Sequence, residues 1–281
     1  MKICETIEDM RTACRAVRAG GKRLGFVPTM GALHDGHLSL VRAARDSCDM
    51  VAASIFVNPT QFGPNEDLAK YPRTFERDRE MLEKEGVKLL FAPSIEEMYP
   101  AGAVTWVTVD GLSGKLDGRS RPGHFRGVTT VVAKLFHIVE PDVAFFGQKD
   151  AAQVAIIRRM VRDLNLHVEI VACPIVREAD GLAMSSRNAY LEPQQRQQAL
   201  VLHRALLRIK KLWEGRERDV GELLAAGREE FAAEKSVRLD YFEIVDPDNL
   251  DPVEIAANGA LVAVAAFVGP TRLIDNILLQ D

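Results

Sequence analysis

The sequence predicts an α/β fold, in which a Rossmann-like, doubly wound parallel sheet is followed by a smaller C-terminal α+β domain. Two observations lead to this prediction. In the first 175 residues, short apolar runs alternate with amphipathic stretches, the pattern of parallel strands joined by crossover helices. After Arg177, two helical stretches precede three strand-like runs, which is typical of a separate α+β unit. We therefore expect domains at 1–175 and 176–281.

Each expected element follows from its local pattern of apolar residues. A first helix is expected to begin near Thr6. The expected strands of the first domain are 24–28, 50–57, 87–92, 104–109, 142–146 and 168–172, and its other helices are 37–47, 74–85, 128–139 and 151–164. The expected elements of the second domain are helices 193–213 and 220–234 and strands 237–245, 260–268 and 272–278. Residues 111–127 are rich in Gly, Arg and Ser and are expected to form a mobile, functional loop.

The composition is that of an ordinary globular protein, with 47% hydrophobic and 27% charged residues. No apolar run approaches the roughly 20 residues that span a bilayer. The net charge of -4 gives no field suited to nucleic-acid phosphates. The four cysteines are scattered, without metal-ligand spacing. We expect a cytoplasmic protein with no membrane or nucleic-acid partner.

The most informative motif is HxGH, formed by His34, Gly36 and His37 where a predicted strand ends and a helix begins. Such a turn brings backbone N–H groups and a helix N-terminus to the carboxyl end of a strand, where phosphate binds. The two histidines fall on one helix face and can donate to the same phosphate chain. With 6 His and 20 Gly in 281 residues, chance would give this pattern about 0.01 times. Ordinary surface histidines are therefore the weaker interpretation.

Two further segments carry groups suited to a nucleotide. In the first, Lys149 offers a charge to phosphate and Asp150 an acceptor to ribose hydroxyls, although Asp150 could equally cap a helix. In the second, Ser185 and Ser186 place hydroxyls beside the guanidinium of Arg187. That arrangement suits an anionic phosphate chain but also makes a capped turn. Neither segment is decisive alone.

Carboxamides mark the expected place of a small polar substrate. Asn58 and Gln61 follow the second predicted strand, and Gln153 lies on the helix that Asp150 opens. Carboxamides both donate and accept, which suits a molecule with hydroxyls and a carboxylate. Their spacing does not require this role, and surface polar groups are the alternative interpretation.

Together these segments resemble the adenylylating α/β superfamily that includes class I aminoacyl-tRNA synthetases and nucleotidyltransferases, and within it the pantothenate synthetase family. The segments that carry the resemblance are PTMGALHDGH, FVNPTQFGPNEDLAKYPR, RPGHFRGVTTVV, FFGQKD and READGLAMSSRNAYL, in the order and spacing of that family. Ser186 and Arg187 stand where the synthetase KMSKS loop has lysines, which counts against a tRNA synthetase. The serine-rich form is the one expected in the pantothenate synthetase family.

The resemblance implies an AMP-forming ligase that joins pantoate to β-alanine with ATP and Mg²⁺, through a pantoyl-adenylate. It implies catalytic roles for His34, His37 and Lys149. The residues that it assigns to ATP are Met30, Gly31, Ala32, Leu33, His34, Asp35, Gly36, His37, Gly147, Gln148, Lys149, Asp150, Val176, Met184, Ser185, Ser186 and Arg187. Those that it assigns to pantoate and β-alanine are Met30, Asn58, Gln61 and Gln153.

The resemblance further suggests a homodimer in pantothenate biosynthesis. Two alternatives remain at this stage, a nucleotidyltransferase that leaves AMP on its product and a nucleotide-binding regulatory module without turnover. The length of chain after Arg177 argues against the first, because such a transferase usually fits in a single small domain. The sequence assigns no ligand to the metal and no base to the amide-forming step.

Overall fold

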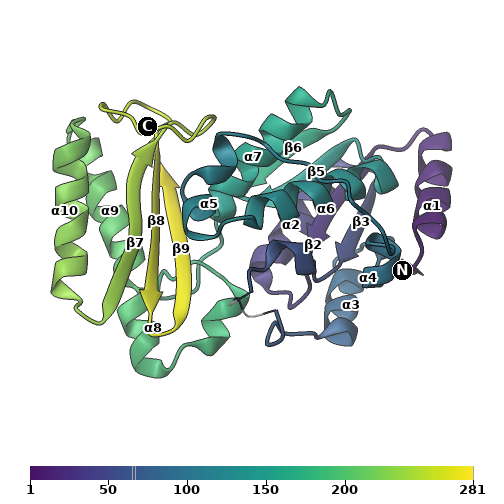
Figure 1. The fold of residues 1–281 in the computed structure, drawn as a ribbon, viewed down its shortest axis with the longest axis horizontal. Coiled ribbons are helices and arrows are strands. Elements are labelled where there is room, and N and C mark those ends of the chain that lie inside the picture. Colours follow the sequence, from purple (N-terminus) through teal and green to yellow (C-terminus); the bar gives the residue numbers. More distant parts are fainter. Residues whose placement is uncertain (65, 67, 281) are drawn as a thin grey trace.

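Parallel strands and their crossover helices form the first part of the computed structural model, which describes residues 1–64, 66 and 68–280. Six strands form a parallel sheet in the order β1-β4-β3-β2-β5-β6, and three later strands form an antiparallel sheet in the order β7-β8-β9 (Figure 1). The predicted fold class is therefore confirmed. The strand order reverses between β2 and β5, which is where doubly wound sheets bind ligands.

The bounds of the elements are as follows. The parallel sheet contains β1 (Lys2–Cys4), β2 (Leu24–Thr29), β3 (Met50–Ile55), β4 (Leu89–Phe91), β5 (Val143–Gly147) and β6 (Glu169–Cys173). Its helices and 3-10 turns are α1 (Ile7–Ala19), α2 (Asp35–Ser47), η1 (Pro59–Gln61), α3 (Phe75–Lys84), α4 (Ile95–Met98), η2 (Leu112–Gly114), α5 (Asp117–Ser120), α6 (His124–Val139), η3 (Gln148–Asp150) and α7 (Ala151–Asp163). The C-terminal part contains η4 (Ser186–Tyr190), α8 (Pro193–Ala199), α9 (Val201–Glu214), α10 (Val220–Ala233), β7 (Val237–Val245), β8 (Leu261–Val268) and β9 (Thr271–Leu278).

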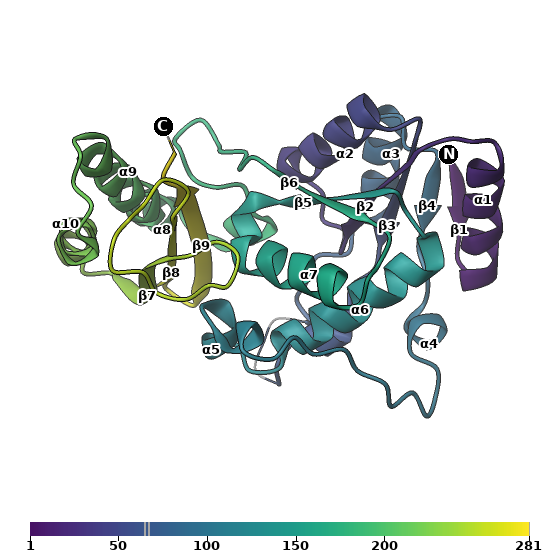
Figure 2. The same cartoon turned by 90° about the horizontal axis from the view of Figure 1, so that it is seen from above.

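Helices cover both faces of the parallel sheet (Figure 2). Neighbouring residues of a strand point to opposite faces, and in β2 this separates two cores. Val27 packs with Leu40 of α2 and Leu82 of α3. Phe26 joins the cluster formed by α1, α6 and α7. Because both faces are buried, the strands read as near-continuous apolar runs, as expected for a parallel sheet.

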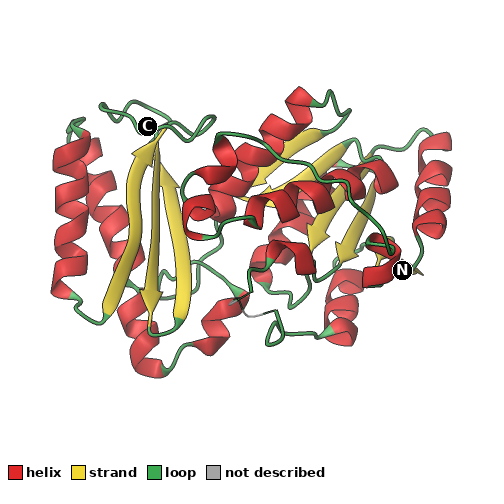
Figure 3. Ribbon diagram, viewed as in Figure 1, coloured by secondary structure: helices red, strands yellow, loops and turns green. Residues whose placement is uncertain are grey.

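The antiparallel sheet also uses its two faces differently. Val262 and Val264 of β8 pack with α9 in a separate core. Ala263 and Ala265, on the other face, join the core of the first part. The three strands stand between α9 and α10 on one side and α5 on the other (Figure 3). The two parts of the molecule therefore share an apolar contact at this sheet.

The strand expected at 104–109 is wrong. The side chains of Val104 and Trp106 are 83% and 42% exposed, and the segment runs beside α6, where the Val107 amide donates to Thr130 Oγ1 at 3.0 Å. The edge of the parallel sheet next to β4 is occupied by β1, which was not expected. The β-branched composition of 104–109 is therefore not sufficient to make this segment a strand of the sheet.

Two other expectations need correction. Residues 111–127, which were expected to form a loop, contain η2, α5 and the start of α6, with Leu116 and Phe125 buried. The single helix expected at 193–213 is divided at Leu200, which ends α8 and precedes α9. No helix in the described residues is long and apolar enough to span a membrane.

Candidate active site

The turn between β2 and α2 carries the first group of predicted residues. Gly31 adopts a φ of +82°, a left-handed conformation that favours glycine. His34 is the N-cap of α2, and the centroids of the His34 and His37 rings lie 4.1 Å apart. The two rings therefore follow the carboxyl end of a central strand, beside the point where the strand order reverses.

Hydrogen bonds determine how the two histidine rings are protonated. The Gly36 amide donates to His34 Nδ1 at 3.2 Å, and the His34 amide donates to His37 Nδ1 at 3.4 Å. Burial, assisted by the charge of Lys149, lowers the pKa of His34 to about 4. Burial, assisted by His34, lowers the pKa of His37 to about 3. Both rings are therefore neutral at pH 7 and carry their proton on Nε2, which makes each Nε2 a hydrogen-bond donor.

The backbone amides of this turn are engaged within the protein, which corrects the expectation that they face a phosphate. The amides of Ala32 and Leu33 donate to the two carboxylate oxygens of Asp78 at 2.8 and 2.9 Å, and the Gly31 amide donates to Thr29 Oγ1 at 3.2 Å. Asp78 lies on α3 and is fully buried. Its carboxylate fixes the turn, so the ring nitrogens are the donors of this segment that suit a ligand.

The turn after β5 carries Lys149 and Asp150. Their charged groups lie 3.7 Å apart, and the side chain of Asp150 is 47% exposed. Both charges influence the pKa values of His34 and His37, which shows that the two turns are close. The parallel pairing of β2 with β5 brings them together.

The segment 177–187 follows β6, carries the serine-rich residues and is here called the arm. A β-bridge between Arg177 and Ala183 forms the arm, and the Met184 amide donates to the Val176 carbonyl at 3.0 Å. A methyl group placed on Gly36 would lie 3.6 Å from Met184 Cβ. The arm therefore passes over the start of α2.

The hydroxyls of the arm have different partners. Ser185 Oγ accepts from the Arg187 amide at 3.2 Å and so caps η4. Ser186 forms a side-chain hydrogen bond with Tyr71, whose pKa is raised by burial. Ser186 is therefore committed to the protein, whereas Ser185 and Arg187 line the cavity between the two parts of the molecule.

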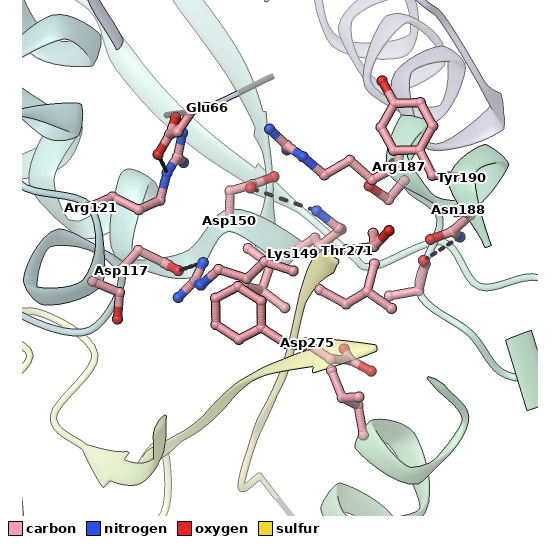
Figure 4. A pocket seen from close by; sticks show the side chains of 18 of the residues that line it. Glu66, Asp117, Arg121, Lys149, Asp150, Arg187, Asn188, Tyr190, Thr271 and Asp275 are labelled. Carbon is pink, nitrogen blue, oxygen red and sulfur yellow. Dashed lines mark hydrogen bonds and ion pairs between the residues drawn. The ribbon is translucent and has the colours of Figure 1, made fainter. Parts of the chain in front are cut away.

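This cavity has a volume of about 910 Å³, which is the size of a cofactor site. Its walls come from α5 and α6, the turn after β5, the arm and β9. Figure 4 shows Lys149 and Asp150 between the Glu66–Arg121 ion pair on one side and Arg187 on the other. The cavity therefore brings together cationic side chains from three separate segments of the chain.

A group of residues in mutual contact beside the cavity, here called the carboxamide corner, consists of Asn58, Gln61, Tyr99, Met30 and Gly127. Asn58 Nδ2 donates to Gln61 Oε1 and to the Gly127 carbonyl, both at 3.1 Å, and Asn58 Oδ1 accepts from Tyr99 Oη at 2.9 Å. Gln61 Nε2 contacts Met30 Sδ at 3.0 Å. Asn58 is 1% exposed, so its side chain orients Gln61 from within the protein.

The junction of α5 and α6 supports the backbone of Gln61. His124 Nδ1 donates to the Gln61 carbonyl at 2.8 Å, and Arg121 lies 3.0 Å from His124 Nε2. Burial and the neighbouring Arg121 lower the pKa of His124 to about 4, so this ring is also neutral. Arg121 contacts both carboxylate oxygens of Glu66, at 2.7 and 2.6 Å.

The predicted residues thus fall into groups. Those that line the large cavity are Lys149, Asp150, Gln153, Ser185 and Arg187. Met30 and Gly31 line a second cavity of about 290 Å³ on the α3 side. Gly147 and Gln148 belong to the turn that carries Lys149. The side chain of Asp35 is 62% exposed and lies 3.8 Å from Arg42, so it is turned to the surface.

Four residues that the sequence did not indicate hold these groups in place, namely Asp78, Tyr99, His124 and Asn276. Their partners lie 41 to 128 positions away in the chain, so no local pattern indicates them. His124 was part of a motif that carried the family resemblance, without an assigned role. The described residues contain no group of three or more His, Cys, Asp or Glu that could hold a metal ion.

Comparison with known proteins shows which family the chain resembles. The family model for pantoate-beta-alanine ligase matches residues 2–278. The chain is 63% identical to the pantothenate synthetase of Koribacter versatilis over 280 residues, covering 100% of this chain and 96% of that protein. It is 58% identical to that of Thermotoga petrophila over 279 residues, covering 99% of this chain and 100% of that protein.

Solved structures extend the likeness to three dimensions. The crystal structure of pantothenate synthetase from Thermus thermophilus has a TM-score of 0.95 and 48% identity over 100% of both chains. The Francisella tularensis ligase, complexed with beta-gamma ATP and beta-alanine, has a TM-score of 0.77 and 34% identity, covering 99% of this chain and 98% of that one. The chain therefore belongs to the pantoate-beta-alanine ligase family.

Proposed function

We propose that this enzyme ligates pantoate to β-alanine with ATP, through a pantoyl-adenylate, and releases pyrophosphate and AMP. One observation carries the proposal. Donors suited to phosphate lie around one cavity, with the carboxamides of Gln61 and Gln153 beside it. The relatives named pantothenate synthetase and the ligase structure with ATP and β-alanine support the same reaction.

In the first step the pantoate carboxylate attacks the α-phosphorus of ATP, and pyrophosphate leaves. Both reactants are anionic, so the protein must position them and offset the negative charge of the transition state. We assign the neutral Nε2–H groups of His34 and His37, the ammonium of Lys149 and the arm at Ser185 and Arg187 to the phosphates. This step needs no covalent enzyme nucleophile.

On the acid side, Gln61 and Gln153 would bind pantoate. Gln61 is held by Asn58 through its side chain and by His124 through its backbone. A carboxamide that is fixed in this way presents its remaining donor and acceptor sites in one orientation. Orientation of a hydroxyl-bearing acid follows directly from this rigidity.

Magnesium would enter with the nucleotide. Mg²⁺ usually keeps several waters and binds substrate phosphates with one or two carboxylates. Among the described carboxylates that line the cavity, that of Asp150 is the most exposed, at 47%, so it is the one open to an ion carried on the nucleotide. When bound, the ion would offset phosphate charge.

In the second step the neutral amine of β-alanine attacks the acyl carbon, the bond to the phosphate oxygen breaks, and AMP leaves. A mixed anhydride is hydrolysed in water, so the site must exclude solvent until the amine arrives. We propose that residues 176–281 act as a lid on residues 1–175, with β9 and α5 as the contact. A reduced radius of gyration on addition of ATP and pantoate, measured by X-ray scattering, would support closure, and an unchanged radius would contradict it.

Isotope exchange tests the stepwise reaction. With pantoate and Mg²⁺ but no β-alanine, the enzyme should incorporate labelled pyrophosphate into ATP. No exchange in an enzyme that still makes pantothenate would exclude a free adenylate, and equal exchange with unrelated acids would exclude pantoate as the selected substrate. A nucleotidyltransferase would instead leave AMP on its product, which phosphorus NMR distinguishes.

We also propose a homodimer in the cytoplasm. The exposed segment 104–109 is rich in β-branched residues and presents Val104 and Trp106 to solvent, which suits pairing with a second copy. Val104→Lys should then shift the sedimentation coefficient from dimer to monomer, and a monomeric wild-type enzyme would contradict the proposal.

The four free cysteines, three of them buried, suit a reducing compartment. Cell fractionation tests that location.

A further inference from the structure

The strand β9 lies at the edge of the antiparallel sheet and places side chains on both of its faces. Because successive residues point to opposite faces, Arg272, Ile274 and Asn276 share one face, and Leu273 and Asp275 share the other. Ile274 packs against the core of the first part, and Leu273 packs against the core of the C-terminal part. Asn276 therefore faces the parallel sheet and its turns.

Asn276 holds the backbone of the turn that carries Lys149. Its Nδ2 atom donates to the carbonyl oxygens of Gln148 and Lys149, both at 2.9 Å, and its Oδ1 atom accepts from Gln148 Nε2 at 3.4 Å. The residue is 2% exposed. A carboxamide nitrogen supplies two donors from one atom, so a single side chain fixes two successive peptide groups.

Asp275 holds the other nucleotide segment from the opposite face of the strand. It is 3% exposed and forms a two-bond ion pair with Arg177, at 2.7 and 3.0 Å. Arg177 begins the arm that leads to Ser185, and it also donates to the Gly181 carbonyl at 3.1 Å. Two consecutive residues of β9 therefore tie the turn after β5 and the arm to the C-terminal sheet.

We propose that Asn276 is a positioning residue for adenylate formation. It sets the backbone at Lys149, so the ammonium reaches the phosphates only when β9 is seated against the turn. Asn276 itself touches no reacting atom. The inference rests on the proposed function and extends it, because it assigns the placement of the lysine to the C-terminal part of the chain.

The test is a double-mutant cycle read by pantoate-dependent pyrophosphate exchange. Asn276→Ala should lower the exchange rate at saturating ATP by about tenfold, the loss expected from one or two hydrogen bonds. The KM for pantoate should stay unchanged. In a Lys149→Ala background, the same substitution should lower the rate by less than about twofold, because its effect acts through the lysine.

Two further variants separate positioning from stability. Trp213→Phe removes a buried hydrogen bond of 2.8 Å, which Trp213 Nε1 donates to the Ala256 carbonyl. Both residues belong to the C-terminal part of the chain and lie away from the turn. It should lower the melting temperature and leave exchange at 25 °C unchanged. Asn276→Ser keeps one donor and should give an intermediate rate, so it remains informative if Asn276→Ala does not fold.

The outcomes are distinct. Wild-type exchange rates in both folded Asn276 variants would overturn the inference, and so would an equal loss from Asn276→Ala with and without Lys149. Absence of pantoate-dependent exchange in the wild type would overturn the proposed function first. Amide hydrogen exchange at 148–150 gives a readout without turnover, and unchanged protection in Asn276→Ala would also count against the inference.

Discussion

The carboxamide corner is built differently from the part of the cavity that carries Lys149, Ser185 and Arg187, here called the phosphate side after its proposed ligand. In the corner, Asn58 bonds to Gln61, Gly127 and Tyr99, all of which belong to the first part of the chain. On the phosphate side, Lys149 comes from the first part, whereas Asn276, which fixes its backbone, comes from the C-terminal sheet. The corner is therefore complete within one part, and the phosphate side depends on both.

The difference indicates a division of labour. A buried and satisfied network is rigid, so we expect the corner to orient the acid before the nucleotide binds. On the phosphate side, we expect the charges of the long side chains to matter most when pyrophosphate departs. Changes in the corner should alter binding of the acid, and changes on the phosphate side should alter the rate of its activation.

The largest effect should come from the phosphate side. Lys149→Ala should lower the pyrophosphate exchange rate by about 10² to 10³, as removal of a preorganised charge donor typically does. The KM for ATP should rise less, since the charge acts chiefly in the transition state. Steady-state exchange over a range of ATP concentrations measures both quantities.

A matched change checks the specificity of that loss. Lys210→Ala removes a half-exposed lysine that lies 3.8 Å from Glu214 on α9, and it should leave exchange unchanged. Asp150→Ala should show the reverse pattern to Lys149→Ala, with a larger change in ATP affinity than in rate. Equal effects of the two substitutions on rate and affinity would contradict the division between them.

The second effect belongs to the corner. Asn58→Ala and Gln61→Ala should each raise the KM for pantoate by about tenfold to thirtyfold, because a buried partner is lost in both cases. If Asn58 acts through Gln61, the KM for pantoate of the double variant should be close to that of the more impaired single variant. ATP affinity should not change, and a parallel loss of ATP affinity would show that the corner and the phosphate side are not separate.

The sequence was sufficient to predict the elements whose patterns are local. The parallel strands show near-continuous apolar runs, and the HxGH turn joins such a strand to a helix, so both could be placed in advance. The segment 104–109 has the same composition as a strand, but β1 occupies the sheet edge beside β4. The β-propensity of a segment does not show which of two segments will pair at the edge of a sheet.

The candidate site shows the same limit. Lys149 and Arg187 were expected from their motifs, and both line the cavity. The residues that hold these segments in place could not be expected from local motifs. Asn276 is 127 positions from Lys149 in the chain, and Asp78 is 46 positions from Ala32. The expected use of the turn amides was also wrong for Ala32 and Leu33, since both donate to the buried carboxylate of Asp78. Long-range partners of this kind are fixed by tertiary packing rather than by local sequence.

A smaller effect is expected from each histidine alone. His34→Ala and His37→Ala should each slow adenylation by about tenfold, since each removes one neutral N–H donor to an anion. Single-turnover measurement of adenylate formation by rapid quench gives the rate. Circular dichroism should show intact folding, and wild-type rates in both folded variants would remove the phosphate role from the motif.

The smallest effect concerns the stability of the protein at acid pH. It also separates the two regions, because ATP should affect the contribution of His37 and not that of His124. The folded pKa values of His37 and His124, about 3 and 4, lie below the value near 6.5 of an unfolded histidine. Between pH 6.5 and 4 the unfolded chain therefore binds protons that the folded chain does not, so the free energy of unfolding falls as the pH falls. His37→Asn and His124→Asn should each reduce this fall, by at most about 2 kcal/mol at pH 5, which urea denaturation at several pH values measures. Saturating ATP should weaken the pH dependence that His37 contributes, because phosphate favours the protonated ring, and should leave the contribution of His124 unchanged. If ATP altered the contributions of both histidines equally, the nucleotide would reach the junction of α5 and α6 that supports Gln61, and the separation of the two regions would fail.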